Sequence, residues 1–229
     1  MKPSHIHLLG VVGFDPLGDT RLKKALEYEK PDAITIGVSE WLVEYFDEEW
    51  LSDQWDKLNY YVGITPNVKS FIEDQICNIY RFPVTVSRDY AESRDVPIHY
   101  IGDPVDLEEV RKSIKGPNRS SSEAINRSET MEEKMKHAEN KYSTFQEWFS
   151  NPDFASQIMM NDFVQRFLSD DPQREAVTAD NLIKLAYRVS GKIVHVAEAE
   201  LLTDDKRGQS LYERVRQLEP TRGTIADYQ

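Results

Sequence analysis

A strand–helix–strand pattern in the first 38 residues constrains the fold more than any other feature of this sequence. Residues 5–12 (HIHLLGVV) form an apolar run followed by a Gly-, Asp- and Pro-containing stretch, which is typical of a buried strand and its turn. Residues 20–29 repeat apolar side chains at helical spacing, with Thr20 as a suitable N-cap. Residues 33–38 (AITIGV) are apolar throughout, as expected of a strand buried on both faces. This order predicts a βαβ crossover and therefore a parallel sheet.

The same reading extends to the rest of the chain. Further strands are expected at residues 96–101, 192–197 and, as a short edge strand, 223–228. Helices are expected at about 39–46, 51–62, 67–80, 84–94, within 128–189, and at 208–218. We therefore predict an α/β fold with a mostly parallel central sheet of about four to five strands and helices on both faces. The chain is expected to be a single domain over residues 1–229, with a helical insertion at about 104–190 before the last core strand.

Composition narrows the classes of partner. The net charge of −12 argues against nucleic acid and against anionic membranes, both of which favour a basic surface. Cys77 is the single cysteine, so no intrachain disulfide can form and nothing indicates an oxidising compartment. No apolar run approaches the roughly 18 residues of a membrane helix, and no signal-peptide pattern is found. We expect an acidic, soluble, cytoplasmic protein without a cofactor.

Four local patterns together resemble the TraB/PrgY/TIKI group, which belongs with the ChaN-like and erythromycin-esterase-like fold. Their order and spacing, rather than any one pattern, carry the resemblance. They are residues 7–39 (HLLGVVGFDPLGDTRLKKALEYEKPDAITIGVS), residues 88–104 (RDYAESRDVPIHYIGDP), Arg174-Glu175-Ala176 with residues 191–196 (GKIVHV), and residues 207–220 (RGQSLYERVRQLEP).

The chain departs from this family where the family places its metal-binding residues. The first Gly-x-x-His of the family would fall on Gly10 to Gly13, and the glutamate of its second strand on Gly37. The second Gly-x-x-His would fall on residues 197–200, or one residue later, so that Glu200 or Leu201 replaces the histidine. Metal-dependent hydrolases of the family are thought to use those histidines and that glutamate. The resemblance implies the fold and a pseudoenzyme without the family's metal site.

Other polar residues lie at the expected strand ends. Asp15, His195, Glu198 and Glu200 are the candidate catalytic residues, because neighbouring carboxylates and imidazoles can act as general acid and base. His7, Asp103 and Arg174 are candidate ligand-binding residues, with Arg174 suited to orienting an anionic group. The alternative is that these side chains are rim residues, helix caps and hydrogen-bonded core histidines in an acidic chain.

Three functions remain open at this point. The first is a divergent TraB-like protein that has lost hydrolase activity and binds a small molecule or peptide, or acts in assembly. The second is a hydrolase that uses a relocated carboxylate and histidine site at the carboxyl ends of the strands. The third is a structural homo-oligomer built through the aromatic region 41–61 or the inserted helices at 128–170.

Overall fold

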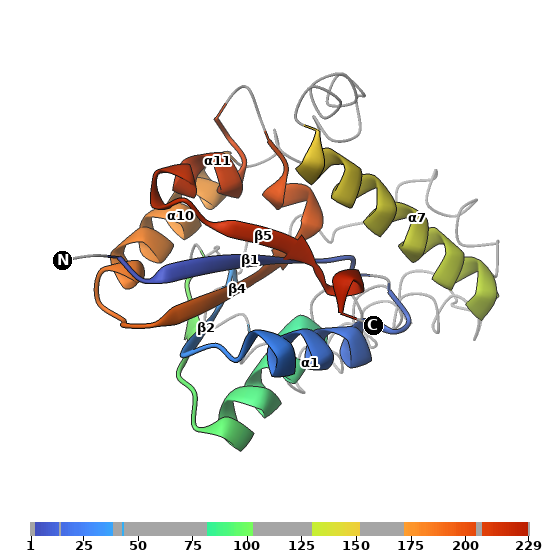
Figure 1. Ribbon diagram of the computed structural model, residues 1–229, viewed down its shortest axis with the longest axis horizontal. Coiled ribbons are helices and arrows are strands. Elements are labelled where there is room, and N and C mark those ends of the chain that lie inside the picture. Colours follow the sequence, from blue (N-terminus) through green and yellow to red (C-terminus); the bar gives the residue numbers. More distant parts are fainter. Residues whose placement is uncertain are drawn as a thin grey trace, which may run out of the picture.

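A five-stranded, all-parallel sheet forms the centre of the computed structural model, with the strand order β3-β2-β4-β1-β5 (Figure 1). The strands are β1 His5–Val11, β2 Ala33–Ile36, β3 Ile98–Tyr100, β4 Lys192–Glu198 and β5 Thr221–Thr224. The structure describes residues 3–13, 15–38, 43, 82–102, 130–151, 172–204 and 208–228, without the side chains of residues 172–174. The predicted α/β fold with a parallel sheet is confirmed.

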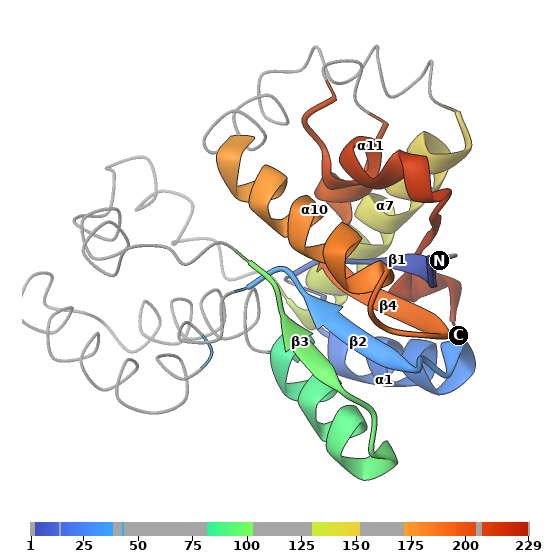
Figure 2. The same cartoon turned by 90° about the vertical axis from the view of Figure 1, so that its left-hand side faces the viewer.

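Helices cover both faces of this sheet (Figure 2). α1 and the helix over residues 82–94 lie on one face, and α10 and α11 lie on the other. Among the described residues, no helix is long and apolar enough to cross a membrane. The other helices are α1 Gly18–Glu29, α7 Met131–Ser150, α10 Pro172–Ala186 and α11 Leu211–Val215, with 3-10 turns η1 Ala199–Leu202, η2 Arg216–Leu218 and η3 Ile225–Asp227.

The central strands are apolar because both of their faces are buried. Leu9 and Val11 of β1 belong to the core beneath α1, whereas Ile6 and Leu8 belong to the core beneath α10 and α11. β4 pairs with β1 from His5 opposite Lys192 to Val11 opposite Glu198. A parallel strand that is covered on both faces needs apolar residues in succession, rather than alternating apolar and polar residues.

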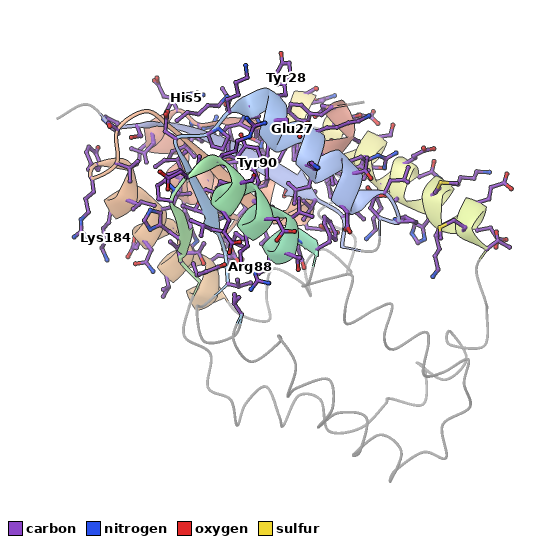
Figure 3. All side chains as sticks on the ribbon, turned by 90° about the horizontal axis from the view of Figure 1, so that it is seen from below. His5, Glu27, Tyr28, Arg88, Tyr90 and Lys184 are labelled. Atoms are coloured by element: carbon purple, nitrogen blue, oxygen red, sulfur yellow. The ribbon has the colours of Figure 1, made fainter. Side chains whose placement is uncertain are left out.

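The helix over residues 82–94 and α1 lie beside each other on the face viewed in Figure 3. Tyr90 of the first helix is 9% exposed and is seen near Glu27 of α1. Burial raises the pKa of the Tyr90 hydroxyl, and the charge of Glu27 acts in the same direction. Tyr90 belongs to the core cluster that also contains Leu22 and Leu26 of α1, so the two helices form one layer.

The start of α1 and the position of the last strand differ from the sequence prediction. α1 begins at Gly18 rather than at Thr20, because Asp15 supplies the acceptors for the first free N–H groups. The Asp15 carboxylate accepts from the Leu17 N–H at 2.9 Å, and the Asp15 carbonyl accepts from the Gly18 N–H at 3.0 Å. The last strand begins at Thr221, two residues before the predicted edge strand, and residues 225–227 form a 3-10 turn instead.

The range predicted as a helical insertion contributes two helices that pack directly on the sheet. α10 covers one face, and its last residue, Ala186, accepts a hydrogen bond from the N–H of Ser4 beside the start of β1. α7 begins with a capping box between Thr130 and Glu133. Predicted elements at 39–46, 51–62 and 67–80, and the aromatic region 41–61, lie outside the described residues, apart from Val43.

Candidate functional site

The carboxyl ends of β1 and β4 form the topological switch point of the sheet. From β1 the chain passes to β2 on one side, and from β4 it passes to β5 on the other. These two strands are neighbours, with Val11 opposite Glu198 at their ends. In open α/β sheets, ligands usually bind at such a point.

Asp15, the first candidate catalytic residue, lies at this switch point as the centre of a hydrogen-bonded cluster. Its side chain is fully buried. One carboxylate oxygen accepts the Leu17 N–H, while the other accepts the Arg21 guanidinium at 3.0 Å and the Tyr142 hydroxyl at 3.0 Å. The hydroxyl of Tyr142 in turn accepts the Val12 N–H at 3.1 Å. Asp15 therefore joins β1, α1 and α7 at one place.

Tyr142 was not among the residues singled out from the sequence. It comes from the buried stripe of α7, which also holds Ala138, Phe145 and Trp148 at helical spacing. Burial raises the pKa of Tyr142 well above its ordinary value, and the neighbouring Asp15 charge raises it further. The hydroxyl therefore stays protonated and donates to Asp15. Helical periodicity reveals such an apolar stripe but carries no information about its polar partner.

α7 also binds the second candidate carboxylate at the switch point. Lys141, the neighbour of Tyr142 in sequence, places its ammonium 3.3 Å from Glu200 of η1. Glu198 ends β4 directly before this turn and is half-buried. Consecutive residues of α7 thus engage carboxylates in the segments that follow β1 and β4. The helix lies against the carboxyl ends of the central strands (Figure 1).

His195, a further candidate, is buried completely within β4. Its Nδ1 atom lies 2.9 Å from the Thr35 hydroxyl of β2, and the two residues are opposite each other in the strand register. Burial lowers the pKa of His195 to about 3, so the ring is neutral at physiological pH. Its Nε2 atom has no hydrogen-bond partner among the described residues.

His7 belongs to a different cluster on the opposite face of the sheet. It lies in register with Val194 of the core beneath α1, whereas His195 lies in register with Leu8 of the other core. His7 Nδ1 is 2.8 Å from the Thr221 hydroxyl, and Nε2 is 3.1 Å from the Tyr228 hydroxyl. The two histidines therefore do not contribute to one site.

The remaining candidates are not placed. Asp103, and Cys77 with it, lies outside the described residues, and of Arg174 only the backbone, in the first turn of α10, is described. Within the described ranges, no group of three or more His, Cys, Asp or Glu side chains could hold a metal ion. Comparisons with protein-family models, with curated proteins and with solved structures find no match for this chain. The family resemblance rests on its four sequence patterns alone.

Proposed function

We propose that the chain is a divergent TraB-like protein that acts in binding or assembly and has lost metal-dependent hydrolase activity. The engagement of the switch point by α7 is the observation that supports this proposal most directly. Tyr142 and Lys141 use Asp15 and Glu200 to hold the helix against the strand ends. The Asp15 carboxylate, which is buried and accepts from three donors, is poorly suited to activating water.

The glycines at the family's ligand positions support the same proposal. Gly13 follows β1 and Gly37 follows β2, and neither residue can supply the imidazole or carboxylate that a divalent metal requires. His195 lies near Gly37, and the Thr35 hydroxyl already contacts its ring. The residues that remain suit recognition of a ligand by hydrogen bonds better than metal-assisted hydrolysis.

Metal content tests this proposal. The protein is purified without chelators, its Zn, Mn and Co are measured by mass spectrometry, and each metal is then titrated by calorimetry. We expect far less than one ion per chain and no saturable binding. Stoichiometric metal would overturn the proposal. The Gly13→His, Gly37→Glu double variant is the matched comparison, and a gain of metal binding in that variant would support the alignment with the family.

The cytoplasm is the compartment that we propose for this function. The single cysteine in 229 residues supports it, because proteins of oxidising compartments commonly use paired cysteines. Fractionation of cells that express the full chain, with the protein detected by antibody, tests this assignment. Recovery in a secreted or envelope fraction would contradict it.

A further inference from the structure

A second hydrogen-bonded cluster lies near the amino ends of the strands, away from the switch point. Tyr228, which follows η3, places its hydroxyl 3.1 Å from Nε2 of His7 and donates to the Glu29 carboxylate. Glu29 ends α1 and also pairs with Lys192, the first residue of β4. Nδ1 of His7 lies 2.8 Å from the hydroxyl of Thr221, the first residue of β5. The cluster therefore joins α1 and the residue after η3 to the neighbouring strands β4, β1 and β5.

Tyr228 covers the polar pair at the centre of this cluster. The side chains of His7 and Glu29 are only 9% and 8% exposed, whereas Tyr228 is half-buried. The Tyr228 ring meets the Tyr28 ring edge-on with centroids 5.3 Å apart, and Tyr28 is 75% exposed and projects from the surface (Figure 3). The N–H of Tyr228 donates to the Ile225 carbonyl at 3.4 Å, which is long for a hydrogen bond. The ring can therefore turn outward without the loss of a short bond from this N–H.

The partners of the Tyr228 hydroxyl assign the protons of the cluster. Burial and the neighbouring Glu29 charge raise the pKa of Tyr228 well above its ordinary value, so the hydroxyl keeps its proton. It donates this proton to the Glu29 carboxylate, because a charged acceptor forms the stronger bond. The Tyr228 oxygen then accepts from the Nε2–H of His7, and Nδ1 of His7 accepts from the Thr221 hydroxyl. The closed cluster thus satisfies a neutral His7 ring at both nitrogens.

A second proton on His7 would disturb this arrangement. Protonated Nδ1 becomes a donor, so the Thr221 hydroxyl would have to turn its own proton elsewhere. The Ile6 carbonyl is 3.5 Å from this hydroxyl, at the limit of hydrogen bonding. Nε2 of His5, which lies 3.2 Å from the same oxygen, is a poor alternative because it is an imidazole that also titrates in acid. Proton uptake by the covered ring therefore costs a good hydrogen bond.

The charges around His7 act in both directions on its pKa. Burial is the largest cause and lowers the pKa, and the charges of Lys192 on β4 and His5 on β1 act in the same direction. Glu29 on α1 and Asp227 on η3 raise the pKa, but the Glu29 carboxylate is 3.9 Å from Nε2 and already pairs with Lys192. The sum is a lowered pKa, which agrees with the hydrogen bonding of the neutral ring.

We propose that the Tyr228 side chain is an acid-released lid, which covers His7 and Glu29 at neutral pH and swings into solvent when His7 takes up a proton. Once Tyr228 has left, water reaches the imidazole, which then binds a proton as an exposed histidine does. Because the open form binds more protons than the closed form, acid favours opening. The opened surface presents an imidazolium beside the Glu29–Lys192 pair. The lid lies near the amino ends of the strands and does not depend on the function proposed for their carboxyl ends.

Ring ¹³C relaxation dispersion of selectively labelled tyrosines measures the ratio of open to closed Tyr228 in the full chain. We expect this ratio to rise about three- to tenfold from about pH 7.5 to about pH 5.5, and about tenfold is the limit for one histidine that titrates near 6.5 in the open form. Glu29 stays ionised in this range, since its pKa lies below 4.5. His7→Asn removes the titrating ring and should abolish the rise. His5→Asn is the matched control at the neighbouring exposed histidine and should preserve it.

A second variant tests the lid from the side of the histidine. Tyr228→Ala removes the cover, so the NMR titration midpoint of His7 should move up toward 6.5. Tyr187→Ala, at a position 45% exposed, is the control and should leave that midpoint unchanged. A ratio of open to closed Tyr228 that does not change with pH, an equal rise in His7→Asn, or an unmoved His7 midpoint in Tyr228→Ala would each overturn the lid. The metal content of the protein has no bearing on these outcomes.

Discussion

The Tyr142 hydroxyl lies between the Val12 N–H, 3.1 Å away, and the Asp15 carboxylate, 3.0 Å away, and so connects α7 to the end of β1. Tyr142 is 1% exposed, and Arg21 lies over its ring at 5.7 Å from the centroid. One hydroxyl thus satisfies a buried backbone donor and a buried carboxylate together. Such a group contributes to stability mainly through the cost of leaving its partners unpaired.

Removing this hydroxyl should destabilise the protein without disturbing its packing. Tyr142→Phe keeps the ring but leaves the Val12 N–H without its acceptor and Asp15 without one donor. We expect the free energy of unfolding to fall by about 1–3 kcal/mol in urea denaturation. Tyr187→Phe is the matched control, because Tyr187 is 45% exposed, and it should change stability by less than about 0.5 kcal/mol. Equal effects of the two variants would contradict this role of Tyr142.

The two carboxylates engaged by α7 should differ in their contribution to stability. The Asp15 side chain is fully buried, and its partner Arg21 is 11% exposed, so Asp15→Asn removes a desolvated ion pair. We expect a loss of about 2–4 kcal/mol, since removing one partner of a buried pair leaves a charge uncompensated. Glu200→Gln acts on the more exposed pair with Lys141 and should cost about 0–1 kcal/mol. Comparable losses of unfolding free energy in Asp15→Asn and Glu200→Gln, measured by urea titration, would show that Asp15 stabilises the protein no more than Glu200 does.

The parallel sheet could be predicted because its signals are local. The apolar strands over 5–12, 33–38 and 192–197, and the helix between the first two, are each visible in a short window, and βαβ order then implies parallel pairing. The start of α1 was misplaced because Asp15, five residues before Thr20, provides the acceptors at the helix start. A capping residue directly before the apolar repeat, such as Thr20, marks the start of a helix only when no such turn precedes it.

The candidate site was predicted less well, for a physical reason. Strand position shows that Asp15 lies at the switch point, but its partner Tyr142 is 127 residues away in sequence. The direction of a histidine also depends on strand register, and a shift of one residue reverses the face. His7 and His195 consequently lie on opposite faces, a relationship that no short pattern reveals.

Arg222 is a second anchor that the sequence analysis did not identify. It lies on β5, donates to the Leu202 carbonyl at 2.8 Å and the Phe149 carbonyl at 3.0 Å, and pairs with Asp204. Its guanidinium also lies 3.7 Å from the centroid of the Tyr212 ring. One side chain therefore joins β5 to η1, α7 and α11.

The planar guanidinium of Arg222 should not be replaceable by an ammonium. Arg222→Lys retains the charge but cannot donate along all of these directions or stack on the ring, so we expect a loss of about 1–3 kcal/mol. Arg188→Lys is the control at an exposed position and should change stability by less than about 0.5 kcal/mol. Urea denaturation monitored by fluorescence measures both variants. An unchanged free energy of unfolding in Arg222→Lys would show that a positive charge alone is sufficient at this position.

The buried histidines should make the protein less stable as the pH falls below 7. The pKa of His195 is about 3 in the folded state, and burial also lowers the pKa of His7. Since an unfolded histidine titrates near 6.5, the unfolded chain binds more protons between that pH and the folded pKa, and acid favours unfolding. His195 alone should lower the free energy of unfolding by about 2 kcal/mol between pH 7 and pH 5, with His7 acting in the same direction.

Glu29 contributes to the pH dependence of stability only below its ordinary pKa, at a lower pH than His195. The effects of Glu29 and His195 on stability can therefore be separated. Burial alone would raise its pKa, but hydrogen bonds from Lys192 and Tyr228 bring the pKa below its ordinary value of 4.5. Stability from Glu29 is therefore present above that value and lost only as the pH falls through the lower folded pKa.

Urea titrations at pH 7 and pH 5 measure how much the free energy of unfolding falls between these two pH values. This fall should shrink by about 2 kcal/mol in His195→Asn, which removes the titrating ring. An undiminished difference in that variant would mean that burial does not keep the His195 ring neutral in the folded state at pH 5.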